Sequence, residues 1–280
     1  MSVLNVGLIQ MCSSTQIEKN LKDAERLIQC AVTDGAELIV LPEYFPLFAQ
    51  SQRQRQGAQE PMGPEHPIQK AIANWSKSHK VWIVAGTLPV QSSHSSRPYA
   101  RSLVYSSEGE CVAHYDKIHL FDVEVSDQTR QYRESEFTHA GAEPRVVTTP
   151  WGNLGLSVCY DIRFAELYQH YHAENCTIIA VPSAFTCPTG RAHWEVLLRA
   201  RAIETQSYVL AAAQTGQHEN GRMTWGHSMV VDPWGEIVGQ LNQQEGYLVS
   251  QIDLAKCAQI ARRMPTREHR VLIPTKSRPE

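Results

Sequence analysis

The sequence predicts an α/β fold in which mixed β-sheets carry helices on their outer faces. The chain opens with an apolar strand, an amphipathic helix and a second apolar strand, the order that joins two parallel strands. Polar turns at 107–110 and 232–235 each separate two apolar runs and indicate antiparallel hairpins. The 280 residues, 42% of them hydrophobic and 20% charged, are enough to build the core of one such domain.

The first elements show these patterns most clearly. Residues 17–32 place apolar side chains three and four positions apart, which predicts a helix that ends at Gly35. The apolar run 36–41, closed by Pro42, predicts a buried strand. By the same criteria we expect strands over 3–10, 36–41, 81–88, 101–106, 111–115, 145–148, 154–158, 177–181, 208–213, 225–231, 236–240 and 247–252, and helices over 17–32, 68–79, 163–172, 192–206 and 254–263.

The connections between these elements include three long or polar stretches. The stretch 44–67 is rich in Gln, Arg and Pro, and we expect a loop that covers or shapes a site. We also expect a long polar connection over 116–141 and a loop over 187–193, and substrate selectivity would lie in the loops at 44–67, 121–141 and 187–193. No repeat or linker divides the chain. Residues 1–263 are therefore expected to form one domain, followed by a Pro- and Arg-rich tail over 264–280 that docks on another surface.

The composition argues against several classes of protein. The formal net charge is −3 and no strongly basic block occurs, so a nucleic-acid partner is not expected. No apolar run reaches the length of a membrane span, and the N-terminus is typical of a strand rather than a signal peptide. The seven cysteines are scattered without a Cys-x-x-Cys pair, which disfavours a disulfide framework and a zinc site. We expect a cytoplasmic protein without a metal.

Three chemically useful side chains follow predicted strands. Glu43 comes after the strand at 36–41, Lys117 after the hairpin, and Cys159 after the apolar run at 154–158. Polar residues at strand ends commonly line the site of an α/β protein. Cys159 could act as a nucleophile, Glu43 as its base, and Lys117 as a positive charge for an oxyanion.

Each of these residues also has a simpler explanation. Cys159 could be one more buried cysteine, and Glu43 and Lys117 could be solvated surface charges. If Cys159 is catalytic, we expect the N-terminus of the following helix and Lys117 to favour its thiolate.

The sequence around these residues resembles the three catalytic blocks of the nitrilase superfamily, the carbon–nitrogen hydrolases. The blocks are Leu-Pro-Glu-Tyr at 41–44, Asp-Lys-Ile-His-Leu-Phe-Asp at 116–122 and Ser-Val-Cys-Tyr-Asp-Ile-Arg-Phe at 157–164. Their order and separation also match, and the resemblance extends from about Val3 to Arg270.

Further motifs are similar to one branch of that superfamily, which holds omega-amidases and deaminated glutathione amidases. They lie at 182–185, 192–204 and 225–235. The loop at 217–220 and the run Ala-Ala-Ala-Gln at 211–214 are closer to the deaminated glutathione side. Ala184 and Phe185, in the first of these motifs, are candidates for substrate contacts.

The resemblance implies an architecture and an assembly. The fold would be a four-layer αββα sandwich of two mixed sheets with helices outside. It would pair as a homodimer or higher homo-oligomer through the helix after Cys159 and the helix around 194–203, with the tail at 264–280 docked on the dimer partner. No metal or organic cofactor is implied.

The resemblance also implies roles for individual residues. Glu43 would be the general acid and base, Lys117 the oxyanion donor and Cys159 the nucleophile. Glu134 matches the position of a second glutamate that supports the site. The backbone N–H of Tyr160 would help to hold the oxyanion.

A substrate with a carboxylate needs a cation near the nucleophile. Arg163, four residues after Cys159, can bind a carboxylate through two N–H groups, and we expect it to bind the substrate. The alternative is a structural ion pair with Asp161 or Glu166. His193 could line the pocket or belong to the core or the subunit interface.

These observations predict a thiol amidase that cleaves the terminal amide of a small carboxylate-bearing molecule to an acid and ammonia through a cysteine thioester. Deaminated glutathione is the first expected substrate. The alternatives within enzymes are an omega-amidase acting on 2-oxoglutaramate-like monoamides, or another small amide or nitrile hydrolase. Outside enzymes, the fold could serve as an inactive interaction protein, or Cys159 as a thiol redox sensor.

Overall fold

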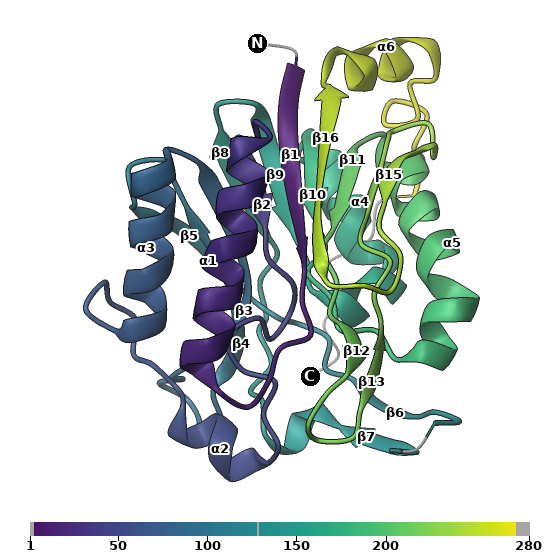
Figure 1. Ribbon diagram of the computed structural model, residues 1–280. Coiled ribbons are helices and arrows are strands. Elements are labelled where there is room, and N and C mark those ends of the chain that lie inside the picture. Colours follow the sequence, from purple (N-terminus) through teal and green to yellow (C-terminus); the bar gives the residue numbers. More distant parts are fainter. Residues whose placement is uncertain (1–2, 128, 273–280) are drawn as a thin grey trace.

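The computed structural model describes residues 3–127 and 129–272. Two six-stranded β-sheets face each other, with helices on both outer sides. Figure 1 shows α1 (Ile17–Thr33) and α3 (Pro67–His79) over one sheet, and α4 (Ala165–Ala173) and α5 (Cys187–Thr205) on the other side of the molecule. The predicted α/β class and the αββα sandwich implied by the resemblance are therefore confirmed.

The first sheet is mixed. Its strand order is β16-β1-β2-β3-β4-β5, in which β1, β2 and β3 run parallel and the other neighbours antiparallel. The strands are β1 (Val3–Gln10), β2 (Leu38–Val40), β3 (Trp82–Val90), β4 (Tyr99–Tyr105), β5 (Cys111–Asp116) and β16 (Gly246–Asp253).

The second sheet is also mixed. Its order is β15-β14-β11-β10-β9-β8, in which β9, β10 and β11 run parallel. The strands are β8 (Arg145–Thr149), β9 (Gly152–Leu156), β10 (Cys176–Ala180), β11 (Tyr208–Ala211), β14 (Met229–Val231) and β15 (Ile237–Gln240).

The longer helices α1, α3, α4 and α5 each bury one face against a sheet. In the first helix, the buried apolar residues lie three and four positions apart, as the sequence predicts. The helices are α1 (Ile17–Thr33), α2 (Gln52–Gly57), α3 (Pro67–His79), α4 (Ala165–Ala173), α5 (Cys187–Thr205) and α6 (Ala255–Arg263). No helix in the described part of the chain is both long and apolar enough to cross a membrane.

The central strands are buried on both faces, which explains their continuous apolar runs. In β2, Leu38 and Val40 join the core between the two sheets, whereas Ile39 joins the core under α1 and α3. From the second sheet, Leu154 and Ile178 complete the core between the sheets. Because both faces are covered, polar side chains can be placed only where these strands end.

Short elements gather at one end of the sandwich, opposite α6 (Figure 1). They include α2 and two small ribbons, formed by β6 (Asp122–Glu124) with β7 (Gln131–Arg133) and by β12 (Thr215–Gln217) with β13 (Met223–Trp225). The stretches 44–67 and 116–141, expected to be loops, therefore contain a short helix and a strand pair.

Three local predictions need correction. The helix expected at 163–172 begins at Ala165, because Cys159–Arg163 forms a separate 3₁₀ turn, η2. The loop expected from Cys187 is already helical, since α5 begins there with a proline in its first turn. The single strand expected over 225–231 is two strands, and Gly226 and His227 between them have positive φ.

The start of the C-terminal tail packs on its own chain. Gln206 donates a hydrogen bond to the Met264 carbonyl at 2.7 Å, and Arg267 donates to the His172 carbonyl at 2.8 Å. Residues 273–280 lie outside the described part of the chain, so docking of the tail on a partner stays a prediction.

One glycine controls the approach of β3 to the segment that carries Glu43. A Cβ at Gly86 would overlap the carbonyl of Pro42, the residue before Glu43. We expect Gly86→Ala to push this segment away, to destabilise the fold by roughly 1–3 kcal/mol and to reduce activity. Urea denaturation and a rate assay would measure both effects. Gly57→Ala, with no atom within 4 Å of its new Cβ, is the control; equal behaviour of the two variants would contradict the expectation.

Candidate active site

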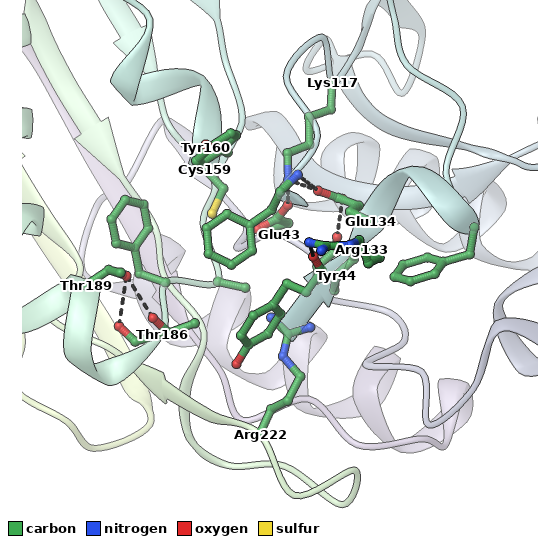
Figure 2. Close-up of a pocket in the computed structure, with 15 residues that line it drawn as sticks. Glu43, Tyr44, Lys117, Arg133, Glu134, Cys159, Tyr160, Thr186, Thr189 and Arg222 are labelled. Atoms are coloured by element: carbon green, nitrogen blue, oxygen red, sulfur yellow. Dashed lines mark hydrogen bonds and ion pairs between the residues drawn. The ribbon is translucent and has the colours of Figure 1, made fainter. Parts of the chain in front are cut away.

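A pocket lies where the ends of both sheets meet the short ribbons. It encloses about 470 Å³, including the part open to solvent. Glu43, Lys117, Glu134 and Cys159, which come from four separate stretches of sequence, all line it. Figure 2 shows the Lys117 amine between the two carboxylates, with the Cys159 sulfur beside Glu43.

Glu43 is held by its backbone. The next residue, Tyr44, has a φ of 58°, in the left-handed region, and its N–H donates to Thr87 Oγ1 at 3.0 Å. The Glu43 carbonyl accepts a hydrogen bond from the Gln214 side chain at 3.0 Å. These contacts turn the chain sharply at the end of β2, so that the Glu43 carboxylate enters the pocket, where the side chain is 1% exposed.

Lys117 directly follows β5, and its backbone N–H donates to the Ala100 carbonyl of β4 at 3.1 Å. The ammonium donates to Glu43 Oε1 and to Glu134 Oε2, each at 2.8 Å. Glu134 begins the 3₁₀ turn η1 (Glu134–Glu136) and also accepts hydrogen bonds from the Tyr44 hydroxyl and the Phe121 N–H. Both ionic partners of Lys117 are therefore fixed by other contacts.

Cys159 sits at the start of η2 with a φ of 49°. Only an over-determined backbone keeps a non-glycine residue in this region. The Cys159 N–H donates to the Pro182 carbonyl at 2.9 Å, and the preceding N–H, of Val158, donates to Asp161 Oδ2 at 2.8 Å. A tight turn is thus present at Cys159, and it holds the thiol at the mouth of the sheet.

The buried Asp161 side chain stabilises this turn through hydrogen bonds. The fully buried carboxylate accepts hydrogen bonds from the Tyr115 hydroxyl at 2.7 Å and from the His119 N–H at 3.1 Å. Among the described residues the basic side chain within 4 Å of this carboxylate is His119, at 2.7 Å, and not Arg163. The sequence did not reveal this positioning role, because Tyr115 and His119 lie more than 40 residues away along the chain.

Burial and charge together set the ionisation of the carboxylates and the lysine. Burial lowers the pKa of Lys117, but the charges of Glu134 and Glu43 more than offset this, and the pKa lies well above its usual value. Burial raises the pKa of Glu43, and Lys117 only partly opposes the rise. Burial also raises the pKa of Glu134, but its contacts to Lys117 and Tyr44 outweigh this and lower it. Lys117 is thus charged, and Glu43 is the carboxylate that takes up a proton more readily.

The protonation state of the Cys159 thiol differs from the one expected from the sequence. Burial, followed by the charge of Glu43, raises its pKa well above the ordinary value, and Lys117 only partly opposes this. The expected thiolate is therefore not the resting form. Figure 2 shows the Cys159 sulfur beside Glu43, which makes this carboxylate the candidate base for the thiol proton.

The structure brings some of the predicted substrate-binding residues to the pocket and leaves others outside its lining. Tyr160, Ala184 and Phe185 line it together with Cys159. Arg163 and His193 are not among the lining residues. The Arg163 guanidinium lies 5.6 Å from the Phe185 ring centre, 5.8 Å from that of Tyr160, and 3.3 Å from His193 Nδ1.

Several lining residues escaped the sequence reasoning. The aromatic ones are Phe121, Tyr132 and Phe137, and the cationic ones are Arg133 and Arg222. Phe121 lies in the block at 116–122, but its place in the pocket was not inferred from that block. The other four residues lie in or near the short ribbons, and no local pattern marks them, because their place in the pocket depends on long-range packing. Among the described residues, no group of three or more His, Cys, Asp or Glu side chains is arranged to hold a metal.

Comparisons with known proteins agree with this geometry. The family described as carbon-nitrogen hydrolase matches residues 5–262. A deaminated glutathione amidase of Yersinia enterocolitica is 42% identical over 266 residues, which are 95% of this chain and 92% of that protein.

Two solved structures show the same fold. The Caenorhabditis elegans NitFhit protein matches with a TM-score of 0.89 and 37% identity over 96% of this chain, which spans 65% of that longer chain. Saccharomyces cerevisiae Nit3, described as a member of the nitrilase superfamily, matches with a TM-score of 0.85 and 28% identity over 94% of this chain and 95% of that one. The chain therefore belongs to the carbon–nitrogen hydrolase family, within the nitrilase superfamily.

Proposed function

We propose that this protein is a thiol amidase that hydrolyses deaminated glutathione through a cysteine thioester. One observation carries the proposal: Cys159, Glu43, Lys117 and Glu134 converge in one pocket in an arrangement suited to acyl transfer. The relatives named deaminated glutathione amidases support the choice of substrate.

In the first step Glu43 takes the thiol proton as Cys159 Sγ attacks the amide carbon. Proton transfer on attack suits a thiol whose pKa is raised, since no free thiolate has to accumulate. The oxyanion accepts hydrogen bonds from the Lys117 ammonium and the Tyr160 backbone N–H. One such donor typically contributes roughly 3–4 kcal/mol to transition-state stabilisation.

Glu43 then gives its proton to the departing nitrogen, the carbon–nitrogen bond breaks, and an acyl thioester remains on Cys159. In the second half, Glu43 takes a proton from water, which attacks the thioester. The acid leaves and the thiol regains its proton. Glu134 holds Lys117 in place and keeps it charged throughout.

The leaving group depends on the substrate. In deaminated glutathione every amide nitrogen is substituted, and the proposed cleavage separates the five-carbon acid from cysteinylglycine. Ammonia is the second product only for primary amides such as 2-oxoglutaramate. Arg163 stays the proposed partner for the carboxylate of the acyl part.

The other predicted functions are less favoured. A redox sensor needs an accessible thiolate, whereas Cys159 is 6% exposed and its pKa is raised. A non-catalytic protein gains nothing from two carboxylates and a lysine kept buried together, which is costly without a use.

We also propose a homodimer in the cytoplasm. Val196 and Ile203 of α5 and the nearby Trp234 are large apolar side chains that are 67%, 50% and 53% exposed, which supports burial against a second copy. All seven cysteines are free, as expected in a reducing compartment.

A substrate panel tests the proposed activity. We expect the highest kcat/KM for deaminated glutathione, with weaker turnover of 2-oxoglutaramate, glutaramate, simple amides and nitriles. Chromatography of the acid product, with separate assays for cysteinylglycine and ammonia, measures each reaction. A preference for 2-oxoglutaramate would establish the omega-amidase alternative instead, and no turnover of any compound would contradict an enzymatic role.

A further inference from the structure

A second pocket opens from the catalytic one. The two share Tyr132, Arg133, Phe137 and Arg222 in their linings. The second pocket, here called the outer pocket, continues over α2 and the loop before it, where Arg55 joins its lining. Figure 2 shows Arg222 on the side of the catalytic pocket away from Lys117.

Of the residues that the structure describes, three arginines and no carboxylate line the outer pocket. Arg133 has a distant carboxylate neighbour, Glu124, at 3.9 Å, and that side chain is 79% exposed to solvent. Arg222 lies 5.0 Å from the Phe48 ring centre and 4.9 Å from that of Tyr132, and no described carboxylate lies within 4 Å of it. The outer pocket is therefore a concentration of positive charge that its own residues do not neutralise.

Arg55 provides the strongest evidence that the outer pocket binds a ligand. It is 9% exposed, and its guanidinium stacks between the rings of Tyr44 and Phe137, at 4.4 and 4.9 Å from their centres. Within residues 3–127 and 129–272, no ion pair or side-chain hydrogen bond involves this guanidinium. Its N–H groups are therefore available to an anion bound in the outer pocket, and the two rings hold the guanidinium in place for such a contact.

The charged groups are distributed unevenly between the two pockets. Glu43, Glu134 and Lys117 lie together in the catalytic pocket, Arg133 and Arg222 line both pockets where they join, and Arg55 lines the outer pocket alone. A substrate with an uncharged amide and an anionic end some distance away would orient itself in this field. The cleaved amide would face Cys159 and the anionic end the three arginines.

We infer that the outer pocket binds a carboxylate on the leaving group, which makes this enzyme selective for amides whose nitrogen carries an acidic, peptide-like chain over small primary amides. The inference rests on the proposed amidase function. For deaminated glutathione the ligand is the terminal carboxylate of the cysteinylglycine part. Arg222 and Arg133 contact the carboxylate at the junction of the two pockets, and Arg55 provides the buried charge behind them.

The test compares two substrates that differ only in this carboxylate: deaminated glutathione and its C-terminal N-methylamide. We expect the wild type to prefer the carboxylate form by at least about ten-fold in kcat/KM, since charge-assisted hydrogen bonds to it are lost in the neutral form. Arg222→Gln should lower this preference by about ten-fold, mainly through KM. Raising the ionic strength should also reduce the preference of the wild type.

Two further variants keep the inference falsifiable. Arg133→Gln changes a partly exposed side chain, so that it tests the outer pocket even if Arg222→Gln folds poorly. Arg262→Gln, on α6 at the opposite end of the molecule (Figure 1), is the matched control and should leave the rates and the preference unchanged.

The outcomes separate the two proposals. If the wild type cleaves neither substrate, the proposed function fails. If it cleaves both equally well, or if Arg222→Gln and Arg133→Gln slow both substrates by the same factor, the activity stands and the outer pocket does not bind the leaving group.

Discussion

Replacing Cys159 with alanine should abolish amide hydrolysis while the protein stays folded. The thiol is the only group in the proposed mechanism that forms a covalent bond to the substrate, so kcat should fall by roughly 10⁴-fold or more. The protein should stay folded because the substitution removes only one small side chain at the edge of the core, where Cys159 is 6% exposed. Acid product, measured by chromatography, should not rise above the uncatalysed rate.

Cys257→Ala is a well-matched control. Cys257 is also 6% exposed and its pKa is likewise raised by burial, to about 12, but it belongs to α6, away from the pocket. This variant should keep wild-type activity. Substantial turnover by Cys159→Ala would show that the thiol is not the nucleophile, and trapping of a labelled thioester on the wild type would identify it directly.

Replacing Lys117 with methionine should have the second largest effect, because it removes both an oxyanion donor and the counter-charge of two buried carboxylates. Glu43 and Glu134 are 1% and 5% exposed and would face each other without a cation. Breaking such a buried ion pair from one side typically costs about 3–5 kcal/mol of stability. Activity should fall by roughly 10²–10³-fold or more.

Urea denaturation as a function of pH measures the stability effect. Without Lys117, burial and mutual repulsion hold the pKa of at least one carboxyl above its value in the unfolded chain. A carboxyl group of this kind destabilises the fold at pH values above its folded-state pKa. At pH values below its unfolded-state pKa it is protonated in both states and does not change the stability. The stability difference between variant and wild type should therefore be largest near pH 7 and shrink as the pH falls through the raised folded-state pKa toward about 4.

Lys256→Met is the control for Lys117→Met. Lys256 also contacts two carboxylates, Asp232 and Glu236, but it is 35% exposed, so its loss should cost no more than about 1 kcal/mol. If the two variants lose similar stability, or if the Lys117→Met penalty does not change with pH, the carboxylates are not coupled as described.

The fold was predictable where burial leaves a local pattern. Strand β2 is apolar throughout because both of its faces are covered, and α1 shows helical spacing because one face packs on a sheet. Prediction failed at 187–191 and around Gly226. There the chain direction depends on packing against distant segments, since a Cβ at Gly190 would overlap the ring of Trp225.

The chemical identities of the site residues came from the sequence by itself. Glu43, Lys117 and Cys159 follow strands and belong to motifs of one family, so their types, their order and the class of reaction could be inferred. Their roles in catalysis stay proposals, for which the shared pocket is the support.

Only the tertiary structure decided which of these groups are charged and what else faces the substrate. Glu43 and Lys117 are 74 residues apart in the chain but 2.8 Å apart in space, and that contact, with burial, sets their ionisation. Burial likewise keeps the Cys159 thiol neutral at rest, and the fold brings the arginines of the outer pocket together without a carboxylate among its described lining residues. Electrostatic energies depend on distance and solvent exposure, which no local stretch of sequence contains.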